Sequence, residues 1–267
     1  MKLRRNRSRE ADPEGRMTLV EHLRELRDRL IKSLVAVAVG ALVAWVAYNR
    51  IFDILIHPYK DLCDSATDTL TNCRLIATDP LEGFTVRLKI ATYGGIAIAM
   101  PVLLWQLWRF ITPGLYPHEK RYAVPFVASA VALFVMGASI AFWTMPKALQ
   151  WLSSIGGSNL VAAYRPASYF QLVTYMMLAF GAGFEFPILL VFLQMAGIVT
   201  TSKLREWRRY AIVVIAVIVA VITPSGDPIS MLALCVPMWL FYEASIVIGR
   251  MRERRRAKAP APAASTT

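Results

Sequence analysis

The chain has 267 residues, of which 56% are hydrophobic and only 18% are charged, and its formal net charge is +12. The apolar residues are gathered in long runs, which excludes an ordinary soluble domain and predicts a polytopic membrane protein. Runs of about 20 apolar residues favour membrane-spanning helices, because the strands of a membrane barrel would alternate in polarity over about ten residues.

The two ends of the chain are polar and basic. Residues 1–16 and 249–267 show no apolar periodicity, so both are predicted to be disordered tails. The membrane domain is expected between them, at residues 17–248.

A short amphipathic helix is predicted just before the first span. Thr18-Leu-Val-Glu21 has the form of a capping box, and leucines recur behind it at helical spacing. We expect this helix to lie on the membrane before the chain turns into the bilayer. Glu21, Glu25 and Asp28 would form an acidic edge on it, away from the leucines.

Six apolar segments predict an all-α integral membrane fold with six transmembrane helices. The fifth has about thirteen residues, roughly 20 Å of helix against a hydrocarbon core of about 30 Å, so the fifth and sixth spans should form a short hairpin. Pro101, Pro187 and Pro237 fall inside spans and should bend them into a curved bundle. The predicted spans are residues 33–48, 90–108, 123–145, 170–197, 210–222 and 229–248.

The distribution of basic residues predicts the orientation of these spans. When successive connections are assigned to opposite sides, most of the 30 Lys and Arg residues fall on the side that holds both termini and the loop at 109–121. The positive-inside rule places that side in the cytoplasm, which explains the net charge without a nucleic-acid partner. The loops at 49–83 and 146–169 then lie outside and are expected to form a periplasmic cap.

Cysteine and histidine positions argue against a metal or catalytic centre. Cys63 and Cys73 share the first outer loop, where an oxidising compartment would permit a disulfide, and two unpaired thiols are the alternative. The three histidines match no metal-ligand spacing, and no nucleophile motif or phosphate-binding loop occurs. No metal, cofactor or enzymatic activity is therefore expected.

Glu185 is a carboxylate well inside an apolar segment. An ionised carboxylate there costs about 2.5 to 3.5 kcal/mol, so Glu185 should face a cavity or a partner, or be protonated and hydrogen-bonded within the bundle. Gln194 is expected to share its polar face. A proton-coupled secondary carrier that uses Glu185 is an alternative function, although no internal repeat of spans supports it.

Several motifs, taken in order along the six spans, resemble those of the TatC family of twin-arginine protein translocases. The resemblance covers residues 17–248. Its motifs are Glu21-His-Leu-Arg-Glu25-Leu-Arg, Pro58 in the first outer loop, Asp79-Pro-Leu-Glu82-Gly-Phe84, Leu107-Trp-Arg-Phe110-Ile-Thr-Pro113-Gly-Leu-Tyr-Pro-His118-Glu119-Lys-Arg121, Ala182-Gly-Phe-Glu185-Phe-Pro187, and Thr223-Pro224 with Asp227.

The resemblance implies a receptor in the bacterial cytoplasmic membrane for folded precursors whose signal peptides carry two consecutive arginines. Glu25 and Glu119 would each accept a guanidinium, while Phe110 and Pro113 would shape the loop beside them. From the residues alone, Glu25 is as well explained by a helical pair with Arg29, and Glu119 by solvation.

The resemblance also implies partners. The single-span subunits TatA and TatB would join the receptor in a site driven by the proton-motive force, and the receptor is expected to self-associate. Glu185, Gln194 and Asp227 would provide polar contacts for partner helices inside the membrane. Pro58 and Glu82 would hold the outer cap.

Overall fold

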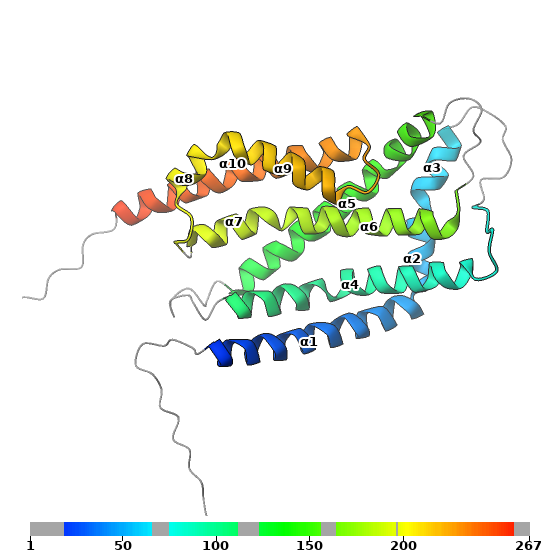
Figure 1. Cartoon of the computed structure of the whole chain (residues 1–267), viewed down its shortest axis with the longest axis horizontal. Helices are drawn as coiled ribbons and strands as arrows, with labels where there is room; N and C mark the ends of the chain where they lie inside the picture. Colours follow the sequence, from blue (N-terminus) through cyan, green and yellow to red (C-terminus); the bar gives the residue numbers. More distant parts are fainter. Residues whose placement is uncertain (1–18, 66–74, 112–122, 156–163, 196, 259–267) are drawn as a thin grey trace, which may run out of the picture.

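The computed structural model describes residues 19–65, 75–111, 123–155, 164–195 and 197–258 (Figure 1). Every regular element in these ranges is an α-helix. The helices are α1 (Leu19–Val46), α2 (Tyr48–Leu55), α3 (His57–Ser65), α4 (Glu82–Ile111), α5 (Ala123–Ile155), α6 (Pro166–Phe184), α7 (Phe186–Met195), α8 (Thr201–Glu206), α9 (Arg208–Ile222) and α10 (Pro228–Lys258).

Five helical segments among the described residues are long and apolar enough to cross a membrane. They confirm a multi-pass membrane protein and comprise Val20–Val46, Glu82–Phe110, Val124–Ile155, Pro166–Gln194 and Pro228–Met251. The remaining predicted span corresponds to α9, which has 15 residues, or about 22 Å of helix. It is short, as its sequence indicates.

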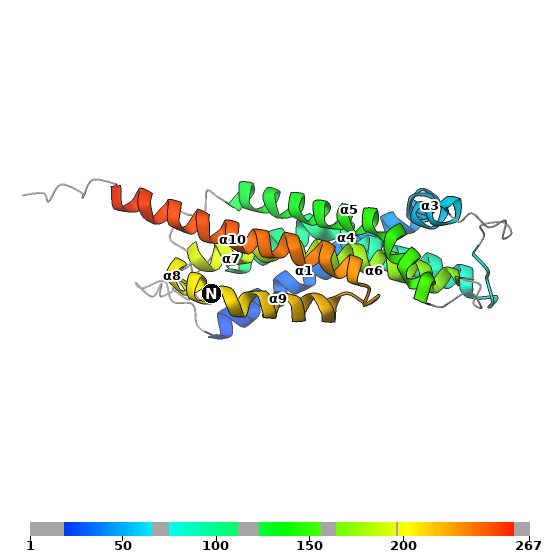
Figure 2. The ribbon, with the colours of Figure 1, turned by 90° about the horizontal axis from the view of Figure 1, so that it is seen from above.

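The long helices run side by side in an elongated bundle. The first residues of α1 and the last residues of α10 lie at the same end, whereas α2 and α3 lie at the opposite end (Figure 1). Seen from above, α1 and α9 lie on one face of the bundle and α5 lies on the other (Figure 2). Helix α6 packs against both α4 and α5 and carries much of the core, including the fully buried Phe170, Phe180 and Phe184.

Two expectations about helix ends were wrong. The amphipathic segment and the first span form one uninterrupted helix, α1, of 28 residues. The chain has no glycine or proline between Leu19 and Gly40, so nothing in the sequence breaks the helix where a turn into the bilayer was expected. Helix α10 likewise continues through Gly249 to Lys258, past residue 248, because residues 250–259 are all strong helix formers and the next proline is Pro260.

Helix α1 docks almost entirely on α4, through small residues. A Cβ atom built on Gly40 would lie 2.5 Å from the carbonyl oxygen of Gly95, and one built on Gly95 would lie 2.6 Å from the Cα atom of Ala41. The two backbones therefore touch where these residues meet. Lipid supplies no hydrophobic force between helices, so such close packing is what holds them together.

Substitution of Gly95 by alanine should loosen this contact. The added methyl group meets backbone atoms of α1, so we expect the free energy of unfolding to fall by about 1 to 3 kcal/mol, measured by thermal unfolding of the purified protein. Gly83→Ala is the matched control in the same helix, since nothing lies within 4 Å of its added Cβ. Equal stability of the two variants would refute the role of the Gly95 contact.

Candidate functional site

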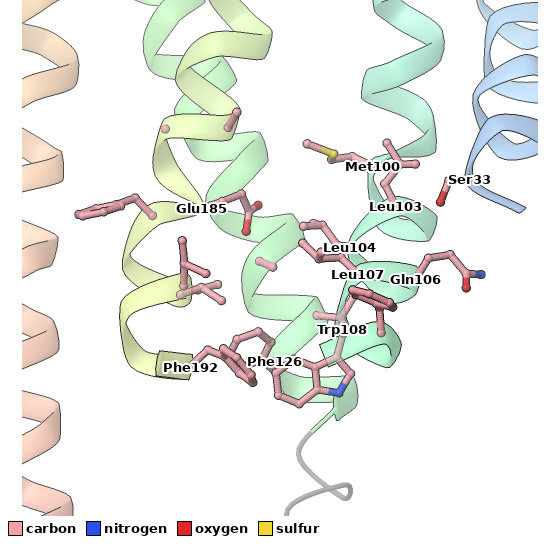
Figure 3. Close-up of a pocket in the computed structure, with 18 of the residues that line it drawn as sticks. Ser33, Met100, Leu103, Leu104, Gln106, Leu107, Trp108, Phe126, Glu185 and Phe192 are labelled. Carbon is pink, nitrogen blue, oxygen red and sulfur yellow. The ribbon is translucent and has the colours of Figure 1, made fainter. Parts of the chain in front are cut away.

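A cavity of about 650 Å³ opens among α1, α4, α5, α6, α7, α9 and α10. Its wall is largely apolar. Trp108, Phe126 and Phe192 form one end of it, where the Trp108 and Phe126 ring centroids lie 4.1 Å apart (Figure 3). The polar residues in the wall are Arg29, Ser33, Gln106 and Glu185. The cavity is thus an apolar space inside the membrane domain with a few polar side chains along it.

Glu185 lies in this wall, with its carboxylate directed toward Leu103 and Leu104 of α4 (Figure 3). Its Oε1 atom is buried and has no hydrogen-bond partner among the described residues. An apolar surrounding does not compensate an ionised carboxylate, so a donor brought in by another molecule would be favourable here.

A break in the fourth long span positions Glu185. Helix α6 ends at Phe184 and α7 begins at Phe186, with the Glu185 N–H donating to the carbonyl of Ala182 at 3.1 Å. Pro187 has no N–H for the carbonyl of Gly183, and this missing hydrogen bond accounts for the break. The sequence predicted a bend at Pro187, and the structure places it just before that residue.

Gln194 does not share a face with Glu185. Its Nε2 atom donates to the carbonyl of Ser245 at 3.2 Å, and its Oε1 atom would lie 2.1 Å from a Cβ on Gly249. Gln194 therefore packs α7 against α10 and is absent from the cavity wall. The expectation of a common polar face was wrong because nine residues are two and a half helical turns, which puts the two side chains on opposite sides.

Asp227 is fully buried, and its contacts are local. The Ser230 N–H donates to its Oδ1 atom at 2.7 Å, and the Ser225 hydroxyl donates to its Oδ2 atom. With Pro228 in the first position of α10, Asp227 is the N-cap of that helix. It fixes the turn between α9 and α10 and does not line the cavity.

Glu25 and Phe110 lie at the same end of the bundle. The His22 ring of α1 stacks on the Phe110 ring of α4, with centroids 4.5 Å apart and planes 17° from parallel. Glu25 lies less than one helical turn beyond His22 and pairs with Arg29, and Arg29 and Phe110 both line the cavity. Glu25 does not itself line the cavity and is joined to its wall through Arg29.

Pro58 and Glu82 lie at the opposite end. Pro58 is buried at the start of α3. Glu82 is 2% exposed and accepts hydrogen bonds from the N–H groups of Thr78 at 2.8 Å and Ala167 at 3.3 Å, with Arg165 at 3.6 Å. It therefore ties the start of α4 to the start of α6.

The remaining predicted site residues lie outside the description. Glu119, Pro113 and Cys73 are not among the described residues, and neither is the side chain of Cys63.

Arg87 makes contacts between helices that the sequence does not predict. Its guanidinium lies 4.6 Å from the Trp45 ring centroid and 5.1 Å from that of Tyr48. It also donates to the carbonyl of Trp45 at 3.2 Å. These contacts join residues about 40 positions apart in the sequence, so no local sequence pattern predicts them.

Comparisons with known proteins agree with these features. The family model described as "Sec-independent protein translocase protein (TatC)" matches residues 21–237. The chain is 44% identical over 250 residues to the Sec-independent protein translocase protein TatC of Frankia casuarinae, covering 92% of this chain and 69% of the relative. It is 38% identical over 243 residues to the protein of the same name from Aquifex aeolicus, covering 90% of this chain and 98% of the relative.

A solved structure has a similar fold. The structure described as "Crystal Structure of Twin Arginine Translocase Receptor- TatC" superposes with a TM-score of 0.72 at 38% identity, covering 88% of this chain and 100% of that chain.

Replacement of Asp227 by alanine should destabilise the turn between α9 and α10. Loss of an N-cap acceptor is expected to lower the free energy of unfolding by about 0.5 to 2 kcal/mol, seen as a lower thermal unfolding temperature. Asp227→Asn keeps the acceptor and should retain most of the stability. If the asparagine variant were as unstable as the alanine variant, the charge and not the cap would be what matters.

Proposed function

Because the chain belongs to the TatC family of Sec-independent protein translocases, we propose that it is the receptor that binds twin-arginine signal peptides of folded precursors. Family membership confirms the resemblance inferred from the motifs. It also identifies a transport protein, not a member of a catalytic enzyme family.

The proposed topology has six transmembrane helices with both termini in the cytoplasm of a bacterium. Two observations support it: the start of α1 and the end of α10 lie at the same end of the bundle, and most of the basic residues in the described ranges are in helices at that end. Residues 17–248 form the membrane domain in this proposal, flanked by two tails. The membrane is the cytoplasmic one.

Recognition of the arginine pair is assigned to Glu25 and Glu119. A carboxylate accepts a guanidinium through paired charge-assisted hydrogen bonds, a geometry that lysine does not reproduce. Glu25 supports this role because it pairs with the cavity-lining Arg29 and lies within one helical turn of His22, which stacks on Phe110. Phe110 and Pro113 shape the loop that carries Glu119. The apolar cavity beyond is suited to the apolar part of the signal.

Glu185 is proposed to contact a helix of a partner subunit, TatA or TatB, in a site driven by the proton-motive force. The supporting observation is its buried oxygen, which lacks a partner among the described residues in the wall of a cavity of about 650 Å³. A small-solute carrier would account for Glu185 alone, whereas a translocase accounts for Glu185 and the acidic edge together.

The other predicted residues serve as the frame in this proposal. Pro58 and Glu82 hold a periplasmic cap that includes α2 and α3, and a disulfide between Cys63 and Cys73 would constrain it. Gln194 and Asp227 hold α10 in place, so they act on partner contacts through helix packing. Self-association of the receptor completes the assembly.

Neutralising the proposed arginine acceptors should weaken signal binding. In Glu25→Gln and Glu119→Gln, the affinity for a synthetic peptide with two consecutive arginines should fall about tenfold or more, since each variant loses hydrogen bonds to a charged group. Binding is measured by fluorescence anisotropy with the full chain in lipid nanodiscs. Glu206→Gln, at the same end of the bundle and exposed, is the control and should bind normally. Wild-type affinity in both test variants would exclude this receptor site.

A photo-crosslinking side chain in the cavity should capture a partner helix. Leu189 lines the cavity and is 47% exposed, so a crosslinker there should react with a single-span subunit in membranes. Val135 of α5 is 56% exposed but does not line the cavity, and serves as the control. Glu185→Gln should reduce the yield at position 189. An unchanged yield would remove Glu185 from the contact.

A further inference from the structure

We propose that Arg29 is an internal competitor for Glu25, so that a signal peptide binds by displacing one guanidinium with another. This inference rests on the proposed function, because it concerns how the same carboxylate is reached.

The pairing of Arg29 with Glu25 is the first observation. Both the Nε and Nη2 atoms of Arg29 donate to the Oε1 atom of Glu25. The two side chains are only 14% and 22% exposed, whereas the neighbouring pair of Arg27 and Asp28 is 71% and 59% exposed. The pair of Arg29 and Glu25 is thus shielded from water. Solvent and salt weaken its electrostatic attraction less than they weaken that of a surface pair.

The second observation is the state of the other carboxylate oxygen. Oε2 of Glu25 is buried and has no partner among the described residues. An incoming guanidinium that binds with both of its hydrogen-bonding edges needs both oxygens. It therefore finds the Oε1 atom occupied by Arg29 and the Oε2 atom unpaired but buried, and full binding requires Arg29 to leave.

The third observation is where Arg29 sits. It lines the cavity beside Leu26 and Leu30, so its long side chain has space to move into once released. Release needs no rearrangement of α1, because only side-chain torsions change.

The consequence is a threshold on binding. A competitor that occupies the site reduces the apparent affinity of every ligand by the same factor. Arg29 therefore lowers the affinity for arginine-bearing and lysine-bearing signals alike, and leaves their ratio unchanged. Ligands that bind weakly then no longer occupy the site, whereas a signal peptide with two consecutive arginines still binds.

The test compares Arg29→Gln with Arg27→Gln in the full chain in nanodiscs. Both variants remove one positive charge from the same stretch of α1, but only the first removes the competitor. Arg29→Gln should bind the di-arginine peptide about two- to tenfold more tightly than Arg27→Gln does. A di-lysine peptide should gain by the same factor. Arg29→Lys keeps the positive charge but lacks the planar guanidinium that donates two hydrogen bonds. Its gain in peptide affinity over wild type should be smaller than that of Arg29→Gln.

The outcomes separate this inference from the proposed function. If Glu25→Gln binds the di-arginine peptide as wild type does, the receptor site itself is wrong. If Glu25→Gln weakens binding but Arg29→Gln gains no more than Arg27→Gln, or loses affinity, Arg29 is not a competitor. A change in the ratio of di-arginine to di-lysine affinity would also overturn it. Should Arg29→Gln fail to fold, Arg29→Lys decides, and a loss of affinity there overturns the inference.

Discussion

The site depends on one contact, the backbone approach of α1 to α4 at Gly40 and Gly95. Helix α1 has little other support, yet its first half supplies one wall of the cavity and carries Glu25. Two glycines facing each other let the helices lie closer than any side chain would permit. The stack of His22 on Phe110 then fixes the near end of the same pair of helices. The geometry at the cavity mouth thus follows from how tightly two helices meet farther along their length.

The cavity combines two requirements that conflict in lipid. In the proposed function it must be apolar to accept a hydrophobic segment, and it must hold polar groups to tell one segment from another. The structure separates these roles along its length: Arg29, paired with Glu25, lies toward the end where α1 begins, and Glu185 lies deeper, where α6 breaks into α7. Asp227 and Gln194 do not line the cavity. Asp227 accepts from the Ser230 N–H and the Ser225 hydroxyl, and the Nε2 atom of Gln194 donates to the carbonyl of Ser245, while the buried Oε1 atom of Gln194 has no partner among the described residues.

Much of this architecture is predictable from sequence, for physical reasons. Long apolar runs identify the spanning helices, and the brevity of the fifth segment shows in α9. Glu185 stands out because a lone carboxylate in an apolar run is costly. The unpredicted features involve contacts between distant residues. No local pattern says that Gly40 meets Gly95, that Glu82 accepts from Ala167, or that Arg87 lies over Trp45. The expectation that Gln194 shares a face with Glu185 was a different kind of error, because a separation of nine residues in a helix already places the two side chains on opposite sides.

The short α9 has a consequence for the lipids around it. In the proposed six-span topology, a helix of about 22 Å beside neighbours of ordinary length leaves the adjoining leaflets with a mismatch that elastic compression of the acyl chains must absorb. The strain costs a fraction of a kcal/mol per Å and is relieved when another helix of matching length takes the place of lipid. In that topology, the edge formed by α9 therefore favours neighbouring helices of similar hydrophobic length, whatever side chains those helices carry.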